Sequence, residues 1–188
     1  MQNRRLPVCV TVDGHKYPIN RMGDYEVILD VIAALEDKEL TERERPYVAL
    51  NIFYDFNIPD DVQKAWDEML RFINCGKTEK PDALPPKPLM NWNKDYPVLV
   101  APINRIVGYD IRSVDYVHWW TFVAAYMEIG ECTFQTIVGI RNKKQKGKRL
   151  DDWECEFYRA NRDKIDLGVE FSDEEEQFFT DLLGVKFE

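Results

Sequence analysis

The first apolar pattern in the chain is that of two short strands. Apolar and polar residues alternate over residues 8–19, on both sides of Asp13-Gly14. Asp-Gly between alternating runs favours a β-hairpin, because both turn positions need a positive φ. Pro18 cannot donate a ladder hydrogen bond, so the second strand must be short or lie at an edge. The sequence therefore predicts one small hairpin that must pack against another part of the chain.

From residue 28 onward the apolar residues follow a helical spacing. Residues three and four positions apart lie on one face of a helix, and this spacing recurs in stripes. The stripes are Ile28, Val31, Ile32 and Leu35; Ala49, Ile52, Phe53 and Phe56; Val62, Ala65, Trp66, Met69, Leu70 and Ile73; Trp119, Phe122, Val123, Tyr126 and Met127; Phe134, Ile137 and Val138; Trp153 and Phe157; and Phe178, Phe179, Leu182 and Leu183. We predict a mainly α-helical chain of about seven or eight helices with the hairpin at its N-terminus.

Prolines divide the chain into two parts. Residues 76–91 show little apolar periodicity and contain Pro81, Pro85, Pro86 and Pro88. Such a segment favours an extended and fairly stiff crossover, which could also serve as a proline-rich ligand. We expect it to join residues 7–75, the hairpin with the first helices, to residues 92–188, the C-terminal helical part. Whether these are two subdomains or one domain is left open.

The start of the second part contains two further prolines. Residues 96–107 are apolar, and Pro97 suits the first turn of a helix there. Pro102 lies deeper in the segment, where a proline removes a hydrogen bond and clashes with the preceding turn. We therefore expect this helix to be kinked or split at Pro102.

Composition excludes several classes of protein. Of the 188 residues, 45% are hydrophobic and 13% aromatic, which is enough for a packed core and unlike a disordered chain. A total of 25 Lys and Arg against 34 Asp and Glu gives a net charge of −9, which argues against a general nucleic-acid binder. No window reaches the roughly 18 apolar residues of a transmembrane helix. We expect a protein without a membrane span or signal peptide.

No motif with the spacing of an active site appears in the sequence. The only histidines are His15 and His118, and neither stands in a metal-ligand pattern. Phosphate-binding glycine loops and nucleophile elbows are also absent from the sequence. The chain has four widely spaced cysteines, for which we expect free thiols: Cys9, Cys75, Cys132 and Cys155. We expect a protein that is not an enzyme and uses no catalytic residue, cofactor or metal.

A basic run interrupts the acidic chain. Six of the nine residues from 141 to 149 are basic: Arg141, Lys143, Lys144, Lys146, Lys148 and Arg149. Such a run can be a solvated helix end, a contact with a protein partner, or a phosphate-binding site. Nucleic-acid modules usually interleave aromatic residues with basic ones, and this run has none, so nucleic acid is the least favoured of the three.

His118-Trp119-Trp120 is the most unusual string in the sequence. Adjacent residues on a helix point about 100° apart, so one indole can face a core while the other faces a groove or a second layer. Together with Phe122, these residues are candidates for anchors between helix pairs or for a partner hot spot. We expect His118 to be structural rather than catalytic.

The same string carries a resemblance to a known family. Residues 116–122 read Tyr-Val-His-Trp-Trp-Thr-Phe and are followed by Gly130, Thr133-Phe134, Ile137 and Arg141. Other elements agree in order, among them Tyr17-Pro18-Ile19-Asn20 after the hairpin, Phe72-x-x-Cys75-Gly76 before the proline-rich segment, and Asp95 after it. Over residues 7–165 the chain resembles the bacteriophage "gene product fifteen" family of Gram-positive phages and prophages. Ala101-Pro102 departs from the smoother helix that this resemblance suggests.

The resemblance implies a protein of the phage tail module. Members of the family look like tail assembly chaperones that bind the tape-measure protein, or other tail proteins, in the host cytoplasm. The resemblance implies no cofactor and no covalent chemistry, and it leaves self-association open. One alternative is a permanent virion component, such as a tail-tube or head–tail connector protein. A second alternative is a DNA-binding regulator that uses residues 141–149.

Overall fold

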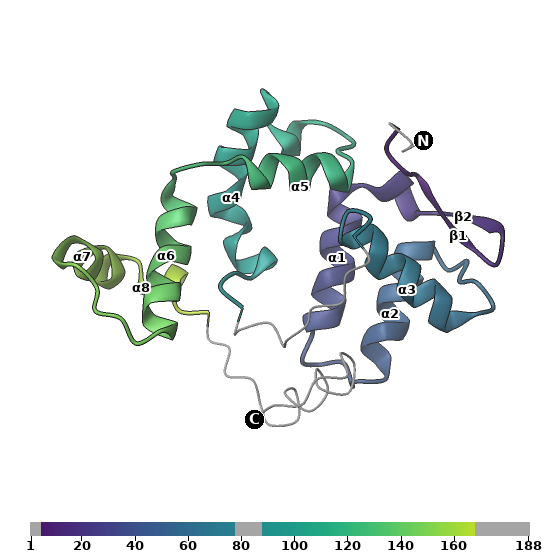
Figure 1. Ribbon diagram of the computed structural model, residues 1–188, viewed down its shortest axis with the longest axis horizontal. Helices are drawn as coiled ribbons and strands as arrows, with labels where there is room; N and C mark the ends of the chain where they lie inside the picture. The colour runs from purple at the N-terminus through teal and green to yellow at the C-terminus, as the bar shows by residue number, and fades with distance from the viewer. Residues whose placement is uncertain (1–4, 78–87, 168–188) are drawn as a thin grey trace. The chain divides into compact units, whose positions relative to one another are not determined.

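The computed structural model describes residues 5–77 and 88–167 (Figure 1). Within these residues the protein is mainly helical, with one two-stranded antiparallel sheet, and the predicted fold class is confirmed. The elements in chain order are β1 (Cys9–Val12), β2 (His15–Pro18), η1 (Asn20–Gly23), α1 (Tyr25–Glu36), α2 (Glu44–Tyr54), α3 (Val62–Ile73), α4 (Trp92–Val107), η2 (Ile111–Ser113), α5 (Trp119–Met127), α6 (Thr133–Gln145), α7 (Asp152–Ala160) and α8 (Arg162–Ile165). The apolar stripe predicted over residues 178–183 lies outside the described residues.

The described residues form two compact units. Unit 1 consists of residues 5–77 and 103–128, and unit 2 consists of residues 88–102 and 129–167. The boundary between them therefore differs from the one expected at the proline-rich segment. Residues 103–128 belong with the N-terminal unit because α5 packs against α1.

The hairpin has the register that Asp13-Gly14 predicts. β1 pairs antiparallel with β2, and Cys9 lies opposite Pro18. Counting from the two-residue turn, bonded and non-bonded pairs alternate, which makes Cys9 and Pro18 a non-bonded pair. The missing N–H of Pro18 therefore breaks no hydrogen bond of the ladder. One position further, the Ile19 N–H donates to the Val8 carbonyl at 3.0 Å.

Unit 1 has an aromatic core. Tyr25 on α1 stacks on Phe122 of α5 with ring centroids 4.8 Å apart, and Phe122 stacks on Trp119 at 5.6 Å. Phe53 on α2 packs edge-on against Phe72 of α3 at 5.6 Å. Aromatic pairs of this kind contribute about 0.5–1.5 kcal/mol beyond the area that they bury. These aromatic pairs thus join α1 to α5 and α2 to α3.

One cluster in the core of unit 2 is aliphatic. Ile137 and Ile140 of α6 and Ile165 of α8 are fully buried together. The partly buried residues that pack around them are Val98, Leu150, Phe157 and Tyr158. This cluster therefore packs α8 against α6.

Four described residues of the predicted stripes are exposed. Phe56, Val62, Met127 and Trp153 are 80%, 55%, 68% and 57% exposed. Helix α2 ends when Asp55 adopts a left-handed conformation, and Phe56 follows with φ 61°, so Phe56 cannot continue the stripe. Val62 and Met127 are the first and last residues of their helices, beyond the packed faces.

Helix α4 begins earlier than predicted. The Asn91 side chain accepts a hydrogen bond from the Lys94 N–H at 2.8 Å, and the Asn91 N–H donates to the Asp95 carboxylate at 2.9 Å. These two bonds cap the helix and start it at Trp92. Pro97 therefore lies in the second turn, and its predicted place in the first turn is wrong.

Helix α4 also continues through Pro102, so the predicted split is wrong. An internal proline costs a helix about 3 kcal/mol or more. Leu99 and Ile103, on either side of Pro102, are fully buried. Burying two such side chains contributes about 1.5–3 kcal/mol each, which offsets the cost of the proline.

Candidate functional site

The His118-Trp119-Trp120 string forms the start of α5 and joins it to the end of α3. The Trp119 Nε1–H donates to the Ile73 carbonyl at 2.8 Å, and the Trp120 Nε1–H donates to the Phe72 carbonyl at 2.8 Å. Both carbonyls belong to the last turn of α3, where the helix itself supplies no donor. The two indoles therefore cap the C-terminal end of a helix that lies more than forty residues earlier in the chain.

Phe72 lies at the centre of this junction. Its ring contacts those of His118 and Trp120, with centroids 5.7 and 5.8 Å away. Gly23 lies so close that a Cβ there would be 2.6 Å from the Phe72 ring, and a Cβ at Gly76 would be 3.3 Å from the Trp120 ring. Two of the strings that carried the family resemblance thus form one packed cluster.

His118 caps the N-terminal end of α5 with one ring nitrogen. Its Nδ1 accepts from the Trp120 N–H at 3.0 Å, and its Nε2 lies 2.9 Å from the Pro7 carbonyl, which can only accept. The ring is therefore neutral and carries its proton on Nε2. Burial lowers the pKa of His118, which favours this neutral form.

Asp24 occupies the equivalent position in front of α1. Its two carboxylate oxygens accept from the Glu26 N–H at 3.0 Å and the Val117 N–H at 2.9 Å. The Tyr25 N–H in turn donates to the Val117 carbonyl at 2.8 Å. Asp24 was not among the predicted residues, although an acidic residue directly before a helical stripe is a common N-cap signal.

The junction uses its polar groups within the chain. His118 and Trp119 are each 2% exposed, Trp120 is half-buried and Phe122 is fully buried. Their hydrogen bonds and ring contacts join α1, α3, α5 and the segment before β1. This geometry favours the interpretation of the string as an anchor over that of a partner hot spot.

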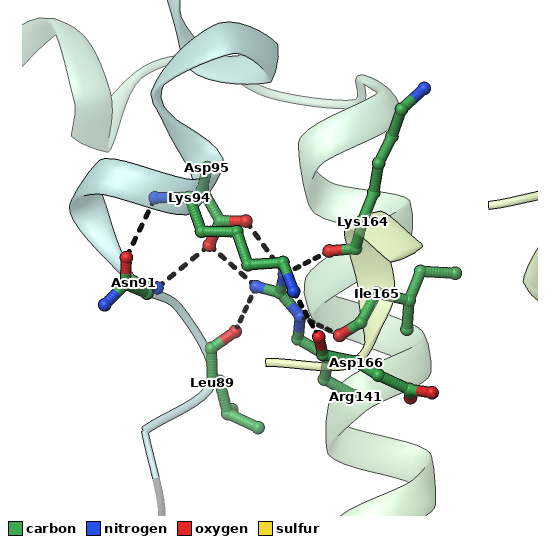
Figure 2. A network of polar contacts seen from close by, with 8 residues as sticks. All are labelled: Leu89, Asn91, Lys94, Asp95, Arg141, Lys164, Ile165 and Asp166. Atoms are coloured by element: carbon green, nitrogen blue, oxygen red, sulfur yellow. Dashed lines mark hydrogen bonds and ion pairs between the residues drawn. The ribbon is translucent and has the colours of Figure 1, made fainter. Parts of the chain in front are cut away.

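A second network, in unit 2, is centred on Arg141 (Figure 2). The Arg141 side chain is 6% exposed and binds both carboxylate oxygens of Asp95, at 2.7 and 2.8 Å. It also donates to the carbonyls of Leu89, Lys164 and Ile165, at 2.9, 2.7 and 2.7 Å. A guanidinium group has five N–H donors, and here every one of them has an acceptor.

This network joins three segments that are distant in sequence. Asp95 lies near the start of α4, Arg141 lies on α6, and the carbonyls of Lys164 and Ile165 belong to α8. A buried charge that loses its partner is costly, so Arg141 cannot leave this site to contact another molecule. Arg141 therefore differs from the exposed residues of the basic run with which it was grouped.

The next two basic residues of the run are also paired. Lys143 lies 2.7 Å from the Glu154 carboxylate, which raises the pKa of Lys143. Lys144 lies 2.6 Å from the Asp166 carboxylate and 2.7 Å from the Tyr158 hydroxyl. These contacts hold α6 against α7 and the end of α8.

The last three basic residues form a separate group, which we call the cationic loop: Lys146, Lys148 and Arg149. All three are exposed and lie between α6 and α7. Within residues 5–77 and 88–167, no side chain forms an ion pair or hydrogen bond with any of them. The structure thus divides the predicted partner-binding run into a structural half and an exposed half.

An open hollow of about 590 Å³ in unit 2 is lined by Lys94, Arg159, Ala160, Arg162, Asp163 and Asp166. Its charges have both signs, and the Asp166 carboxylate already accepts from Lys144, Tyr158 and Arg162. The charges that line the hollow therefore favour neither an anionic nor a cationic ligand.

The described residues hold no candidate metal site, and their cysteines are free. No group of three or more His, Cys, Asp or Glu side chains among them could hold a metal ion. Cys9, Cys75, Cys132 and Cys155 are free, partly buried thiols. None of the helices that the structure describes has the length and apolar character needed to cross a membrane.

Comparison with known proteins identifies one family. The family described as "bacteriophage Gp15 protein" matches residues 2–167. Neither the curated proteins nor the solved structures contain a match to this chain. The matched range includes every described residue, and therefore both the aromatic junction of unit 1 and the Arg141 network of unit 2.

Proposed function

Because the chain belongs to the bacteriophage Gp15 protein family, we propose that it is a tail assembly chaperone that binds the phage tape-measure protein. It acts by non-covalent binding in the host cytoplasm and performs no catalysis. The observation that supports this proposal best is the family match, which covers residues 2–167. His118, Trp119 and Arg141 are buried and bonded to the chain's own backbone, so the binding surface must be formed by other, exposed side chains.

Unit 1 has exposed apolar side chains that are available to bind a partner. Phe56, Tyr47 and Met22 are 80%, 65% and 55% exposed. Aromatic residues and methionine are enriched where proteins bind one another, and methionine adapts to irregular apolar surfaces. A long helical partner needs its apolar stripes covered before assembly, and side chains of this kind can cover them.

Phe56 is the most exposed of these residues and has an unusual backbone. Both Asp55 and Phe56 have positive φ, at 49° and 61°. A bulky residue in this region of φ and ψ costs about 1 kcal/mol or more, and such strain tends to occur at functional positions. The turn after α2 directs a large apolar ring into solvent, which is the property that a chaperone surface requires.

Co-expression with the tape-measure protein of the same phage tests the proposal. We expect a complex that co-purifies through size-exclusion chromatography, and a larger soluble fraction of the tape-measure protein than without the chaperone. An unrelated coiled-coil protein of similar length serves as the control partner. No complex and no gain in solubility would contradict the proposal.

Mass spectrometry of purified phage particles separates the chaperone from the alternative. A chaperone is absent from finished particles or present only in traces. A fixed, stoichiometric amount in the particles would instead make the protein a virion component, such as a tail-tube or head–tail connector protein.

A further inference from the structure

The positive charge of this acidic chain is local to one run of residues. Residues 141–149 include six Lys or Arg and no Asp or Glu, although the whole chain has a net charge of −9. The unit that contains this run is not itself cationic, because residues 79–102 and 129–188 include 13 Lys and Arg against 17 Asp and Glu. The run is therefore a cationic segment within an acidic unit.

Ion pairs inside unit 2 neutralise the first half of the run and leave the cationic loop exposed. Arg141, Lys143 and Lys144 are each neutralised by carboxylates of their own unit. Lys146, Lys148 and Arg149 follow directly in sequence and have no such partner among the described residues. The loop thus presents three positive charges to solvent.

The backbone of the cationic loop is held in place. The Lys146 N–H donates to the Asn142 carbonyl at 3.1 Å, and the Gly147 N–H donates to the Lys144 carbonyl at 3.0 Å. The Lys148 N–H then returns to the Lys143 carbonyl at 2.8 Å, a turn that Gly147 permits through its φ of 61°. A loop with a fixed backbone loses less entropy when it binds a partner.

An exposed tryptophan follows the cationic loop. Trp153 lies in the first turn of α7, four residues after Arg149, and is 57% exposed. Trp153 and Phe157 were predicted to lie on one face of a helix. Phe157 packs against the isoleucine cluster, whereas Trp153, one turn earlier, is exposed. Tryptophan and arginine are the residues most enriched in binding hot spots.

We propose that the cationic loop and Trp153 form a docking site for an acidic segment of a partner protein. The carboxylates of that segment pair with Lys146, Lys148 and Arg149, and an apolar side chain covers Trp153. Opposite charges steer the encounter, and burial of the indole slows dissociation. The inference concerns a different surface from the apolar side chains of unit 1 and does not depend on the tape-measure proposal.

Nucleic acid fits this surface less well than an acidic protein segment. Proteins that hold duplex DNA commonly neutralise about 6–10 phosphates, and this loop has three cations. Asp151 and Asp152 follow the loop after Leu150 and would repel a continuous phosphate backbone. A protein segment can instead place single carboxylates at the three cations and a neutral residue beside the two aspartates.

Fluorescence anisotropy with the full-length protein tests the docking site. The probe is a labelled synthetic peptide of glutamate and leucine, and a peptide with lysine in place of glutamate is its control. We expect the wild type to bind the acidic peptide with an affinity that falls as salt rises. The variant K146E/K148E/R149E should bind it at least about tenfold more weakly. Trp153→Ala should also weaken binding.

A matched variant separates the site from the net charge. K16E/K38E/R43E makes the same charge change in unit 1 and should bind within about twofold of the wild type. Circular dichroism checks that both variants are folded. If the loop variant is not folded, K146Q/K148Q/R149Q replaces it with the same expectation.

Four outcomes would overturn the inference. The first is no binding of the acidic peptide by the wild type, and the second is equal loss in both charge variants. The third is tighter binding of single- or double-stranded DNA than of the peptide. The fourth is peptide binding only after Asp173, Glu174, Glu175 and Glu176 are changed to Asn and Gln, which would mean that the chain's own acidic C-terminal sequence competes for the site.

Discussion

In unit 1 helix ends meet through aromatic rings, whereas in unit 2 they meet around one buried ion pair. Both solutions supply side-chain N–H donors to backbone carbonyls at the ends of helices. In unit 1 the donors are the neutral indoles of Trp119 and Trp120. In unit 2 the donor is the charged Arg141, which also requires the carboxylate of Asp95. We infer that the neutral junction can lose one hydrogen bond while its other contacts remain. In the charged network, loss of one charged partner leaves the other buried and unpaired, which destabilises the whole network.

The largest effect should come from breaking the charged network. Arg141→Met leaves Asp95 buried without a counter-charge and three carbonyls without a donor. We expect a loss of about 3–5 kcal/mol in the free energy of unfolding. Urea denaturation followed by circular dichroism measures this loss, and hydrogen exchange should rise first in α6 and α8.

Two further variants make that test specific. Arg149→Met removes an exposed arginine of the same run and should change stability by no more than about 0.5 kcal/mol. Asp95→Leu combined with Arg141→Met removes both charges and should recover part of the loss. A loss below about 1 kcal/mol for Arg141→Met alone would remove the contrast between the units.

The next largest effect should come from the neutral junction, and it should be graded. Trp119→Phe removes a fully buried donor and should cost about 2–3 kcal/mol. Trp120→Phe removes a half-buried donor whose partner, the Phe72 carbonyl, also accepts from the Cys75 N–H, and should cost about 1 kcal/mol. Thermal unfolding of both variants, with Trp153→Phe as an exposed control, checks this order. Equal losses at both positions would contradict a graded junction.

A pair of glycine variants measures how tightly the junction is packed. Gly23 and Gly14 have nearly equal φ, 79° and 82°, but only Gly23 faces the Phe72 ring. Gly14→Ala should cost about 1 kcal/mol through backbone strain alone. Gly23→Ala should cost about 1–3 kcal/mol more, because its Cβ would overlap the ring. Chemical denaturation of the two variants gives the difference, and equal costs would mean that the ring moves aside freely.

The smallest effect should be a pH dependence that belongs to unit 1. Because burial lowers the pKa of His118, the unfolded chain binds a proton at a higher pH than the folded chain. The stability that the neutral ring contributes is therefore present above the unfolded pKa of about 6.5 and is lost as pH falls below it. His118→Asn keeps an acceptor for the helix cap without titrating. Between pH 7 and 5 this variant should lose less stability than the wild type, whereas His15→Gln should follow the wild type.

Sequence reasoning predicted the features that depend on neighbours in the chain. Asp13-Gly14 fixes its own turn, and the stripe from Ala65 to Met69 fixes the buried face of its helix. For the same reason the free cationic loop could be recognised as a basic run. Local spacing determines such features because the responsible atoms are only a few residues apart.

The features that were missed depend on distant residues. Asp95 starts α4 early and is paired in its buried position with Arg141, 46 residues away. Periodicity could not tell that Phe157 would meet the core while Trp153 faced solvent. It also could not show that α5 belongs with α1, because that choice rests on the fit between Tyr25 and Phe122. Pairing and packing at long range, rather than pattern, decided these outcomes.

Because every N–H donor of Arg141 is bonded, few substitutions should be tolerated at position 141. Lysine is the usual neutral exchange for arginine, but its three donors radiate from one atom and cannot serve two carboxylate oxygens and three carbonyls of separate segments. A codon change from arginine to lysine should therefore be purged at position 141. At position 149, where the same side chain extends into solvent, selection should accept either amino acid.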